Sequence, residues 1–346
     1  MTHRQFNRII LGAAGLMVGA LIALNVAVDP FGMFGTSPLA DGPSSNERFI
    51  KIEQIRKADM DFELLILGSS RSGMTDPAWL EEVTGLTTYN LSAFSARPSD
   101  MLTLYKSYRL YRPAPLMAMV GVDAMGFLVE PEDRDLSRRH HPSVAKTGGT
   151  SYWLDYLLAP SVLAAMEKLS LSEEPNIRFD WHKGTYSLPG YEREIAADAV
   201  AYREKTFTNW AGREFASQLD RRELTALAEL LAVLDQDAVE LHLFLQPMHR
   251  QWKARMAPLM ITLSPELERF SGIVDLSGIG SDNDEMWYEQ RHYREPVARA
   301  VVQALFDAPA GTDPMAVAAG SRRATESPPG WEANAESPRS AASMRQ

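Results

Sequence analysis

The strongest constraint on the fold is a short apolar run at residues 62–72 that ends in a glycine and small hydroxyl residues. Its sequence is Phe-Glu-Leu-Leu-Ile-Leu-Gly-Ser-Ser-Arg-Ser, which is typical of a buried parallel strand followed by a tight turn. Open α/β sheets bind ligands at the carboxyl ends of their strands, so a serine here would stand exposed on a rigid support. The same pattern also fits a polar strand-to-helix loop without chemistry.

Strand and helix patterns alternate along the rest of the chain. Four further strands are predicted at residues 87–91, 115–122, 238–246 and 272–276, and helices at residues 47–57, 77–83, 98–111, 222–235 and 296–306. This alternation predicts an α/β fold, a three-layer α/β/α arrangement around a mainly parallel five-stranded sheet. Residues from about 130 to 215 are irregular and aromatic-rich, and we expect an insertion over the carboxyl edge of the sheet. Its aromatic residues fit a small core or, at a rim, stacking on sugar rings.

The N-terminal segment is apolar from residue 9 to residue 28, apart from Asn25, and follows His3, Arg4 and Arg8. A helix of about 20 residues spans the hydrocarbon core of a bilayer. Basic residues before such a helix keep the N-terminus cytoplasmic. We therefore expect residues 1–28 to form a single transmembrane anchor in the inner membrane, with the main domain periplasmic or extracytoplasmic. A cleaved signal peptide is the alternative, although its apolar core usually has only about 7 to 15 residues.

Composition limits the classes of function. The 346 residues carry a formal net charge of −10, which argues against nucleic-acid binding because phosphates must be neutralised by Lys and Arg. With no cysteine, disulfides, thiolate zinc sites and a cysteine nucleophile are excluded. No cofactor and no metal site is expected from the spacing of histidines and carboxylates. Residues 29–46 are predicted to be a linker, residues 47–307 the α/β domain, and residues 308–346 a disordered tail.

Polar residues gather at the ends of the predicted strands and before the last helix. They are Ser69, Ser70 and Arg71; Asn90 and Ser92, followed by Ala93; Asp123; and Glu289 with His292. A serine attacks a carbonyl only if a base removes its proton, and a carboxylate fixes the tautomer of that base. Glu289 and His292 can bond if they lie on a helical turn or in a turn just before the last helix. We expect His292 to be the base and Glu289 to orient it, although capping and turn-stabilising roles fit these residues too.

The order of these motifs resembles that of the SGNH (GDSL-type) hydrolase superfamily. The resemblance is to its membrane-anchored envelope branch, whose members assist D-alanylation of teichoic acids and acetylation of alginate, and it covers residues 29–306 without the insertion. Gly68-Ser69-Ser70 stands where the family has Gly-Asp-Ser, and residues 289–292, Glu-Gln-Arg-His, stand where it has Asp-x-x-His. The resemblance implies an SGNH/flavodoxin-like fold with Ser70 as the nucleophile.

The two middle motifs depart from the family pattern. The second motif of the family supplies a glycine N–H to the oxyanion hole, whereas residues 90–93 contain no glycine, and the third supplies an Asn amide where this chain has Asp123. An ionised carboxylate there opposes the developing negative charge, and a lost oxyanion donor costs about 10²–10³ in rate. The candidate oxyanion or cleft-lining residues are Arg71, Asn90, Ser92, Ala93, Asp123 and His249, with Arg97 as a further donor.

The resemblance implies a membrane-anchored extracytoplasmic serine esterase or O-acyltransferase that acts on an envelope or exported polysaccharide. Its expected partners are a cell-envelope polysaccharide or an acyl donor, a membrane acyltransferase, and the inner membrane. The alternative is a catalytically inactive SGNH-like scaffold, or a glycan-binding component, in a polysaccharide assembly complex. Asp123 and the missing glycine favour the scaffold, whereas Ser70, Glu289 and His292 favour the enzyme.

Overall fold

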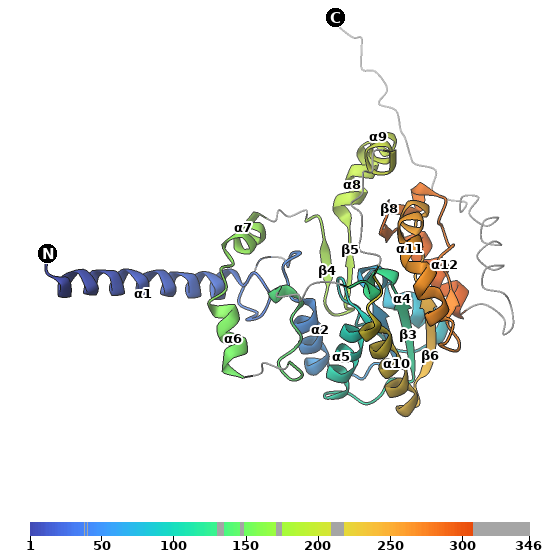
Figure 1. Cartoon of the computed structure of the whole chain (residues 1–346), viewed down its shortest axis with the longest axis horizontal. Coiled ribbons are helices and arrows are strands. Elements are labelled where there is room, and N and C mark those ends of the chain that lie inside the picture. The colour runs from blue at the N-terminus through green and yellow to red at the C-terminus, as the bar shows by residue number, and fades with distance from the viewer. Residues whose placement is uncertain are drawn as a thin grey trace, which may run out of the picture.

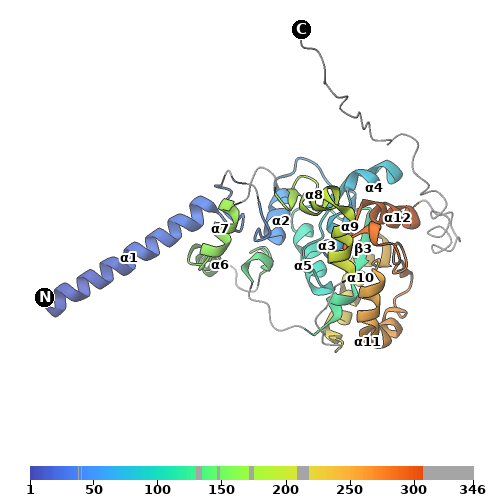
Figure 2. The ribbon, with the colours of Figure 1, turned by 90° about the horizontal axis from the view of Figure 1, so that it is seen from above.

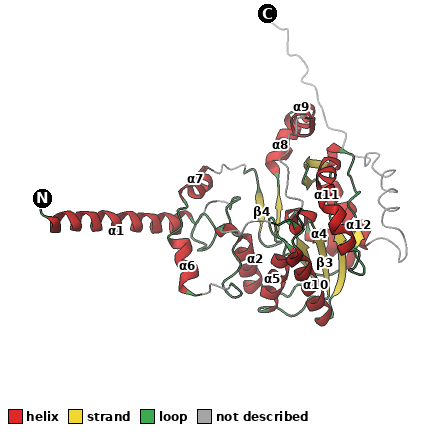
Figure 3. Ribbon diagram, in the orientation of Figure 1, coloured by secondary structure: helices red, strands yellow, loops and turns green. Residues whose placement is uncertain are grey.

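A computed structural model describes residues 1–37, 39, 41–129, 135–145, 149–170, 175–208 and 218–306. The tail predicted at residues 308–346 and parts of the predicted insertion lie outside these ranges. At the centre of the domain is a parallel sheet of five strands in the order β2-β1-β3-β6-β7 (Figures 1 and 3). The strands are β1 (Leu64–Gly68), β2 (Thr88–Asn90), β3 (Met117–Val122), β6 (Glu240–Leu245) and β7 (Val274–Asp275).

The strand order places β1 between β2 and β3. The chain therefore leaves β1 toward one edge of the sheet and returns to pair on its other side. A crevice opens above the carboxyl ends of the strands at such a reversal, which is where ligands of open α/β sheets bind. All five strands lie in segments that the sequence predicts, so the expectation of an α/β fold with a five-stranded parallel sheet is confirmed.

Helices cover both faces of the sheet. Successive strand side chains point to opposite faces, so Leu65 and Leu67 pack on one side while Leu64 and Ile66 pack on the other. The first side is covered by α2 (Glu47–Lys57), α5 (Pro98–Arg109), α10 (Arg221–Gln236) and α11 (Arg250–Leu267), and the second by α4 (Pro77–Thr84) and α12 (Glu295–Phe306). The sequence pattern does not predict α11, which contains two prolines that are unfavourable inside a helix.

An apolar helix, α1 (His3–Val28), extends away from the domain at its N-terminal end (Figure 1). By length and composition it is a candidate membrane span. The segment predicted as a linker after it is folded: the Asp29 carboxylate accepts hydrogen bonds from the backbone N–H groups of Met33, Phe34 and Gly35. Asn46, at the start of α2, is fully buried. A structured connection therefore joins α1 to the domain.

Most of the remaining elements lie between α5 and α10 in the chain. They are the 3₁₀ turns η1 (Ala124–Phe127) and η2 (Leu136–Arg138), α6 (Thr150–Leu157), α7 (Val162–Ser170), β4 (Arg178–Asp180), β5 (Thr185–Ser187), α8 (Pro189–Ala197), α9 (Ala199–Arg203) and the π-helical turn η3 (Glu204–Thr208). Figures 1 and 2 both show α6 and α7 beside the C-terminal end of α1. The antiparallel β4–β5 hairpin reaches the carboxyl edge of the sheet, where the backbone N–H of Asn90 donates to the carbonyl of Lys183.

Candidate active site

Ser70 is the first residue of a short helix, α3 (Ser70–Gly73), that follows β1 directly. Two glycines let this turn pack closely against the sheet. A Cβ on Gly68 would lie 2.1 Å from the Ser72 hydroxyl, and one on Gly121 would lie 2.6 Å from it. The Ser72 hydroxyl in turn accepts a 2.6 Å hydrogen bond from the side chain of Gln246, the residue after β6. These contacts hold Ser70 rigidly at the end of β1.

The Ser70 hydroxyl meets an imidazole that comes from the far end of the chain. Ser70 Oγ lies 2.9 Å from His292 Nε2, across 222 positions of sequence. His292 Nδ1 is hydrogen bonded to Glu289 Oε1. When the Nδ1–H donates to Glu289, the Nε2 lone pair is free to accept the serine proton. The three residues expected to act together are therefore brought together at one edge of the sheet.

Glu289 and His292 face each other across a β-hairpin rather than a helical turn. The hairpin consists of β8 (Trp287–Glu289) and β9 (His292–Tyr293), and the two residues are register partners in it. It follows the 3₁₀ turn η4 (Asp284–Met286) and precedes α12. Of the two arrangements that the sequence allows, the structure has the turn before the last helix.

The Glu289 carboxylate is held ionised by its surroundings. Burial raises the pKa of this carboxyl, but the hydrogen bond and charge of His292, with the charge of Arg291, outweigh burial, so its pKa lies below the ordinary value. Glu289 Oε2 also accepts a 3.1 Å hydrogen bond from the backbone N–H of Arg291. A negative charge next to Nδ1 stabilises an imidazolium, which is the form that His292 takes after it accepts a proton.

Asp123 is neutralised by a buried arginine. Arg71 Nε lies 3.3 Å from Asp123 Oδ2, and Arg71 Nη1 donates to the Pro247 carbonyl at 2.9 Å. The Asp123 carboxylate also accepts hydrogen bonds from the Ser69 hydroxyl and from the backbone N–H of Met125. Arg71 thus pairs with Asp123 by charge, while its Nε and Nη2 are buried without a hydrogen-bond partner in the described part of the chain, so its guanidinium stays a candidate oxyanion donor.

The residues expected to replace the missing glycine are buried and engaged elsewhere. The Asn90 amide donates to the carbonyls of Ser72 and Thr75, and its oxygen accepts from the backbone N–H and the hydroxyl of Ser92. The backbone N–H of Ala93 donates to the Gly68 carbonyl. The prediction that Asn90, Ser92 or Ala93 donates to the oxyanion is therefore wrong. Their hydrogen bonds instead join the loop after β2 to the turn after β1.

Two further cleft candidates also have structural roles. Arg97 donates from Nε to the Gly126 carbonyl at 3.0 Å and pairs with Asp220. His249 is fully buried, and its Nε2 lies 2.9 Å from Asp284 Oδ1. Burial lowers the pKa of this imidazole against the opposing effect of Asp284. The prediction of His249 as a cleft-lining residue is wrong, because it lies in the packing between α11 and η4.

Ser95 is a site residue that the sequence does not reveal. Its φ is 52°, a left-handed conformation that is uncommon for residues other than glycine. The backbone N–H of Ser95 has no acceptor within the described part of the chain. At Ser70, the first position of α3, the N–H has no acceptor within the helix. Because Ser70 and Ser95 line the same cavity as His292, these two amides are candidate oxyanion donors. A glycine at position 95 would have revealed this conformation.

The loop that carries Ser95 rests on charged residues buried in α2. Glu47 accepts a hydrogen bond from the backbone N–H of Phe94 at 3.0 Å, and Arg48 donates to the Phe94 carbonyl at 3.2 Å. Lys51 Nζ donates to the Ser92 carbonyl at 2.5 Å and lies 3.5 Å from Glu47. Burial lowers the pKa of Lys51 to about 8. These contacts fix the backbone directly before Ser95, the candidate oxyanion donor.

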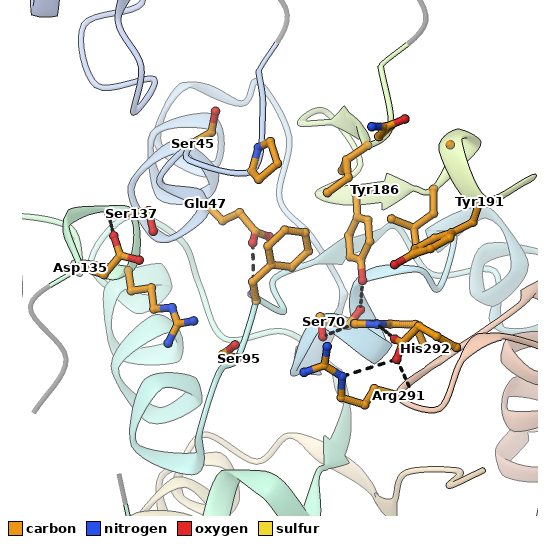
Figure 4. A pocket seen from close by; sticks show the side chains of 18 of the residues that line it. Ser45, Glu47, Ser70, Ser95, Asp135, Ser137, Tyr186, Tyr191, Arg291 and His292 are labelled. Atoms are coloured by element: carbon orange, nitrogen blue, oxygen red, sulfur yellow. Dashed lines mark hydrogen bonds and ion pairs between the residues drawn. The ribbon is translucent and has the colours of Figure 1, made fainter. Parts of the chain in front are cut away.

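Ser70 and His292 lie between two cavities. The larger, about 580 Å³, extends from them toward Ser45 and Glu47 on one side and toward Tyr186 and Tyr191 on the other (Figure 4). The smaller, about 100 Å³, is lined by Ser95, Met125 and the Arg71–Asp123 pair, among others. Tyr186 also donates its hydroxyl to the Ser70 carbonyl at 2.6 Å. The serine can therefore be reached by two parts of one substrate.

Compared with known protein families and with curated proteins, the sequence matches none of them. Within the described ranges, no group of three or more His, Asp or Glu side chains is placed to hold a metal ion.

Proposed function

We propose that the protein is a membrane-anchored, extracytoplasmic serine esterase or O-acyltransferase of the SGNH type, acting on an envelope or exported polysaccharide. The observation that carries the proposal is the chain of hydrogen bonds from the Ser70 hydroxyl through His292 to Glu289. A serine, an imidazole and a carboxylate in this arrangement activate the hydroxyl as a nucleophile.

In the first half-reaction, Ser70 Oγ attacks the acyl carbon of an ester while His292 Nε2 takes the serine proton. The carbonyl oxygen becomes an oxyanion, which the backbone N–H groups of Ser70 and Ser95 stabilise. When the tetrahedral intermediate collapses, the bond from the acyl carbon to the alcohol oxygen breaks. His292 returns its proton to that oxygen, and the acyl group remains on Ser70.

The second half-reaction repeats these steps with a new nucleophile. Water, or a hydroxyl group of a sugar, gives its proton to His292 and attacks the acyl carbon, and Ser70 regains its proton as the acyl bond to it breaks. A volume of about 580 Å³ lies within the range of cavities that hold small ligands, roughly 300–1,000 Å³. It therefore suits the sugar, while the smaller cavity suits the acyl group. Transfer in place of hydrolysis requires that the bound sugar exclude water.

The basic residues before α1 and the candidate span itself support an extracytoplasmic domain. A scaffold without catalysis is the second candidate. It is favoured by the carboxylate of Asp123 at the position of an amide donor and by the engagement of the Asn90 side chain.

The two candidates are separated by labelling the purified full-length protein with a fluorophosphonate probe and by measuring its turnover of an acetyl ester. We expect labelling and turnover in the wild type and neither in Ser70→Ala. Ser69→Ala is the matched control, because Ser69 is adjacent but bonds Asp123, and it should keep the label. An unlabelled wild type, or equal turnover in Ser70→Ala, would leave the scaffold as the function.

A further inference from the structure

The side chains in the first turns of α1 are exposed to solvent, whereas most of those in its last two turns are packed against other parts of the protein. Side chains before residue 21 are exposed almost throughout, and from residue 21 onward most are at least partly covered. Asn25 and Val28 are buried. The cover is provided by α6 and α7, which both lie against this end of the helix (Figures 1 and 2). We name α6, α7 and the turn between them, residues 150–170, the collar.

The collar is fastened to α1 by the one strongly polar residue of the apolar run. The Asn25 amide donates to the carbonyls of Tyr156, Leu157 and Ala159, at 3.1, 2.9 and 3.0 Å. Its oxygen accepts the Ser161 hydroxyl. These carbonyls and this hydroxyl belong to the end of α6 and the turn before α7. Because all of these bonds are at least partly buried, α1 and the collar form one rigid unit.

The outward side of α7 is apolar, the reverse of a helix on a water-soluble surface. It carries four residues that are exposed by 50, 81, 60 and 58%: Val162, Leu163, Met166 and Leu169. The inward side holds Ala165 and Lys168, both buried, and Lys168 Nζ donates to the Asp29 carbonyl at 2.8 Å. Contiguous exposed apolar side chains of this kind mark a surface that meets another apolar phase.

The length of α1 identifies that phase. Residues 9–28 are apolar and, at 1.5 Å per residue, about 30 Å long, which equals the hydrocarbon core of a bilayer. The bare part, residues 9–20, is only about 18 Å long by the same rise. The helix therefore spans the hydrocarbon core of the bilayer only if residues 21–28, the covered turns, also lie in it. Because the collar is fixed to those turns, it must lie at the same depth as they do.

We propose that the collar is an interfacial membrane-binding element whose α7 face inserts at the headgroup–acyl boundary of the leaflet from which α1 emerges. The occupant of this face is lipid, since the collar lies against the end of the candidate span and α7 has the apolar face of an interfacial helix. The inference rests on α1 lying in a bilayer and is independent of the chemistry of Ser70. It also relates the cleft to the membrane: Ser44 donates to Glu167 of α7 at 2.7 Å, and Pro43 and Ser45 line the larger cavity.

Because the chain contains no cysteine, a single introduced cysteine can carry an environment-sensitive nitrobenzoxadiazole fluorophore. The full-length protein is labelled at Leu163→Cys or Met166→Cys and reconstituted into phosphatidylcholine–phosphatidylglycerol vesicles that contain no other protein. Nitroxide lipids with the quencher near the headgroup or near the acyl-chain end then report depth. Ile261→Cys is the matched control, an apolar residue 77% exposed on α11, and Leu16→Cys reports on α1 itself.

We expect the probes at positions 163 and 166 to lose most of their fluorescence to the shallow quencher. The Leu16 probe should lose its fluorescence to the deep quencher, and the Ile261 probe should keep its own. If the Leu16 probe is quenched while positions 163 and 166 behave like position 261, the collar proposal is wrong and the anchor stands. An unquenched Leu16 probe overturns anchor and collar together, and none of these outcomes depends on ester turnover.

Discussion

At the scale of single residues, Glu289 is one methylene longer than the aspartate of the motif that it resembles. The β8–β9 hairpin accommodates the longer side chain, because register partners in a narrow antiparallel pair lie close enough for a glutamate to reach an imidazole across the strands. On a helical turn the same residues would be neighbours along one face. The hairpin therefore gives the same carboxylate–imidazole contact from a different backbone.

Replacing this carboxylate by its amide tests whether it acts on His292. In Glu289→Gln the imidazole loses the acceptor that fixes its tautomer, and we expect kcat for an acetyl ester to fall by about 10⁴-fold, as for amides in other triads, with little change in KM. Glu192→Gln is the control, since Glu192 pairs with Arg294 outside the relay. Unchanged kcat in Glu289→Gln would mean that the carboxylate only caps the hairpin.

The same change, from carboxylate to amide, tests the ion pair that Asp123 forms with Arg71. In Asp123→Asn the buried Arg71 loses the carboxylate that neutralises it, so we expect the unfolding free energy to fall by roughly 3 kcal/mol, and activity not to rise. The measurement is urea unfolding of the detergent-solubilised protein. In the double variant Arg71→Met/Asp123→Asn, which removes both charges, most of the loss should be regained. Equal stability of the single variant and the wild type would show that the pair is not coupled.

At the scale of secondary-structure elements, the sequence predicts the strands and helices whose positions follow from the local pattern of apolar residues. Strands buried on both faces give continuous apolar runs, so β1, β3 and β6 are predicted within a few residues of their ends. Ser70 is predicted because it follows such a strand, and His292 because it lies three residues after Glu289 and just before the last helix. Ser95 and Lys51 are not, because a left-handed serine and a buried lysine are stabilised only by contacts between α2 and the loop after β2. No local pattern encodes those contacts.

The buried charge of α2 makes stability depend on pH in an unusual direction. Burial lowers the pKa of Lys51 from 10.5 to about 8. Between these values the unfolded chain holds the proton and the folded chain releases it, so the unfolded state binds more protons and this lysine makes stability rise with pH. In Lys51→Met this contribution disappears. We expect the stability difference, wild type minus variant, to grow from pH 8 to pH 10.5, by at most about 1.4 kcal/mol per pH unit.

Urea titrations at several pH values measure this difference. Lys57→Met, on the same helix but with an exposed side chain, is the control and should show no such divergence from the wild type. Parallel pH curves for Lys51→Met and the wild type would show that Lys51 titrates as it does in water.

At the scale of the whole molecule, the site is assembled from segments that are far apart in the chain. Ser70 follows β1, Ser95 follows β2, Met125 follows β3, and His292 precedes α12. The walls of the larger cavity come in part from residues before α2 and from the β4–β5 hairpin. A pattern search finds the segments but not the volumes between them, since these depend on how the layers pack. The unequal size of the two cavities is therefore information that only the structure supplies.

The difference in volume between the two cavities predicts which acyl groups the site accepts. A cavity of about 100 Å³ holds roughly three water volumes, enough for an acetyl group but not for a long chain. We expect kcat/KM for a series of aryl esters to be highest for short acyl groups and to fall by about tenfold or more per methylene once the cavity is full. Met125→Ala enlarges this cavity and should shift the optimum toward longer chains. Met74→Ala, on a separate cavity behind Tyr186, should not. If octanoyl esters react as fast as acetyl esters in the wild type, the acyl chain occupies the larger cavity, and the roles assigned to the two cavities must be exchanged.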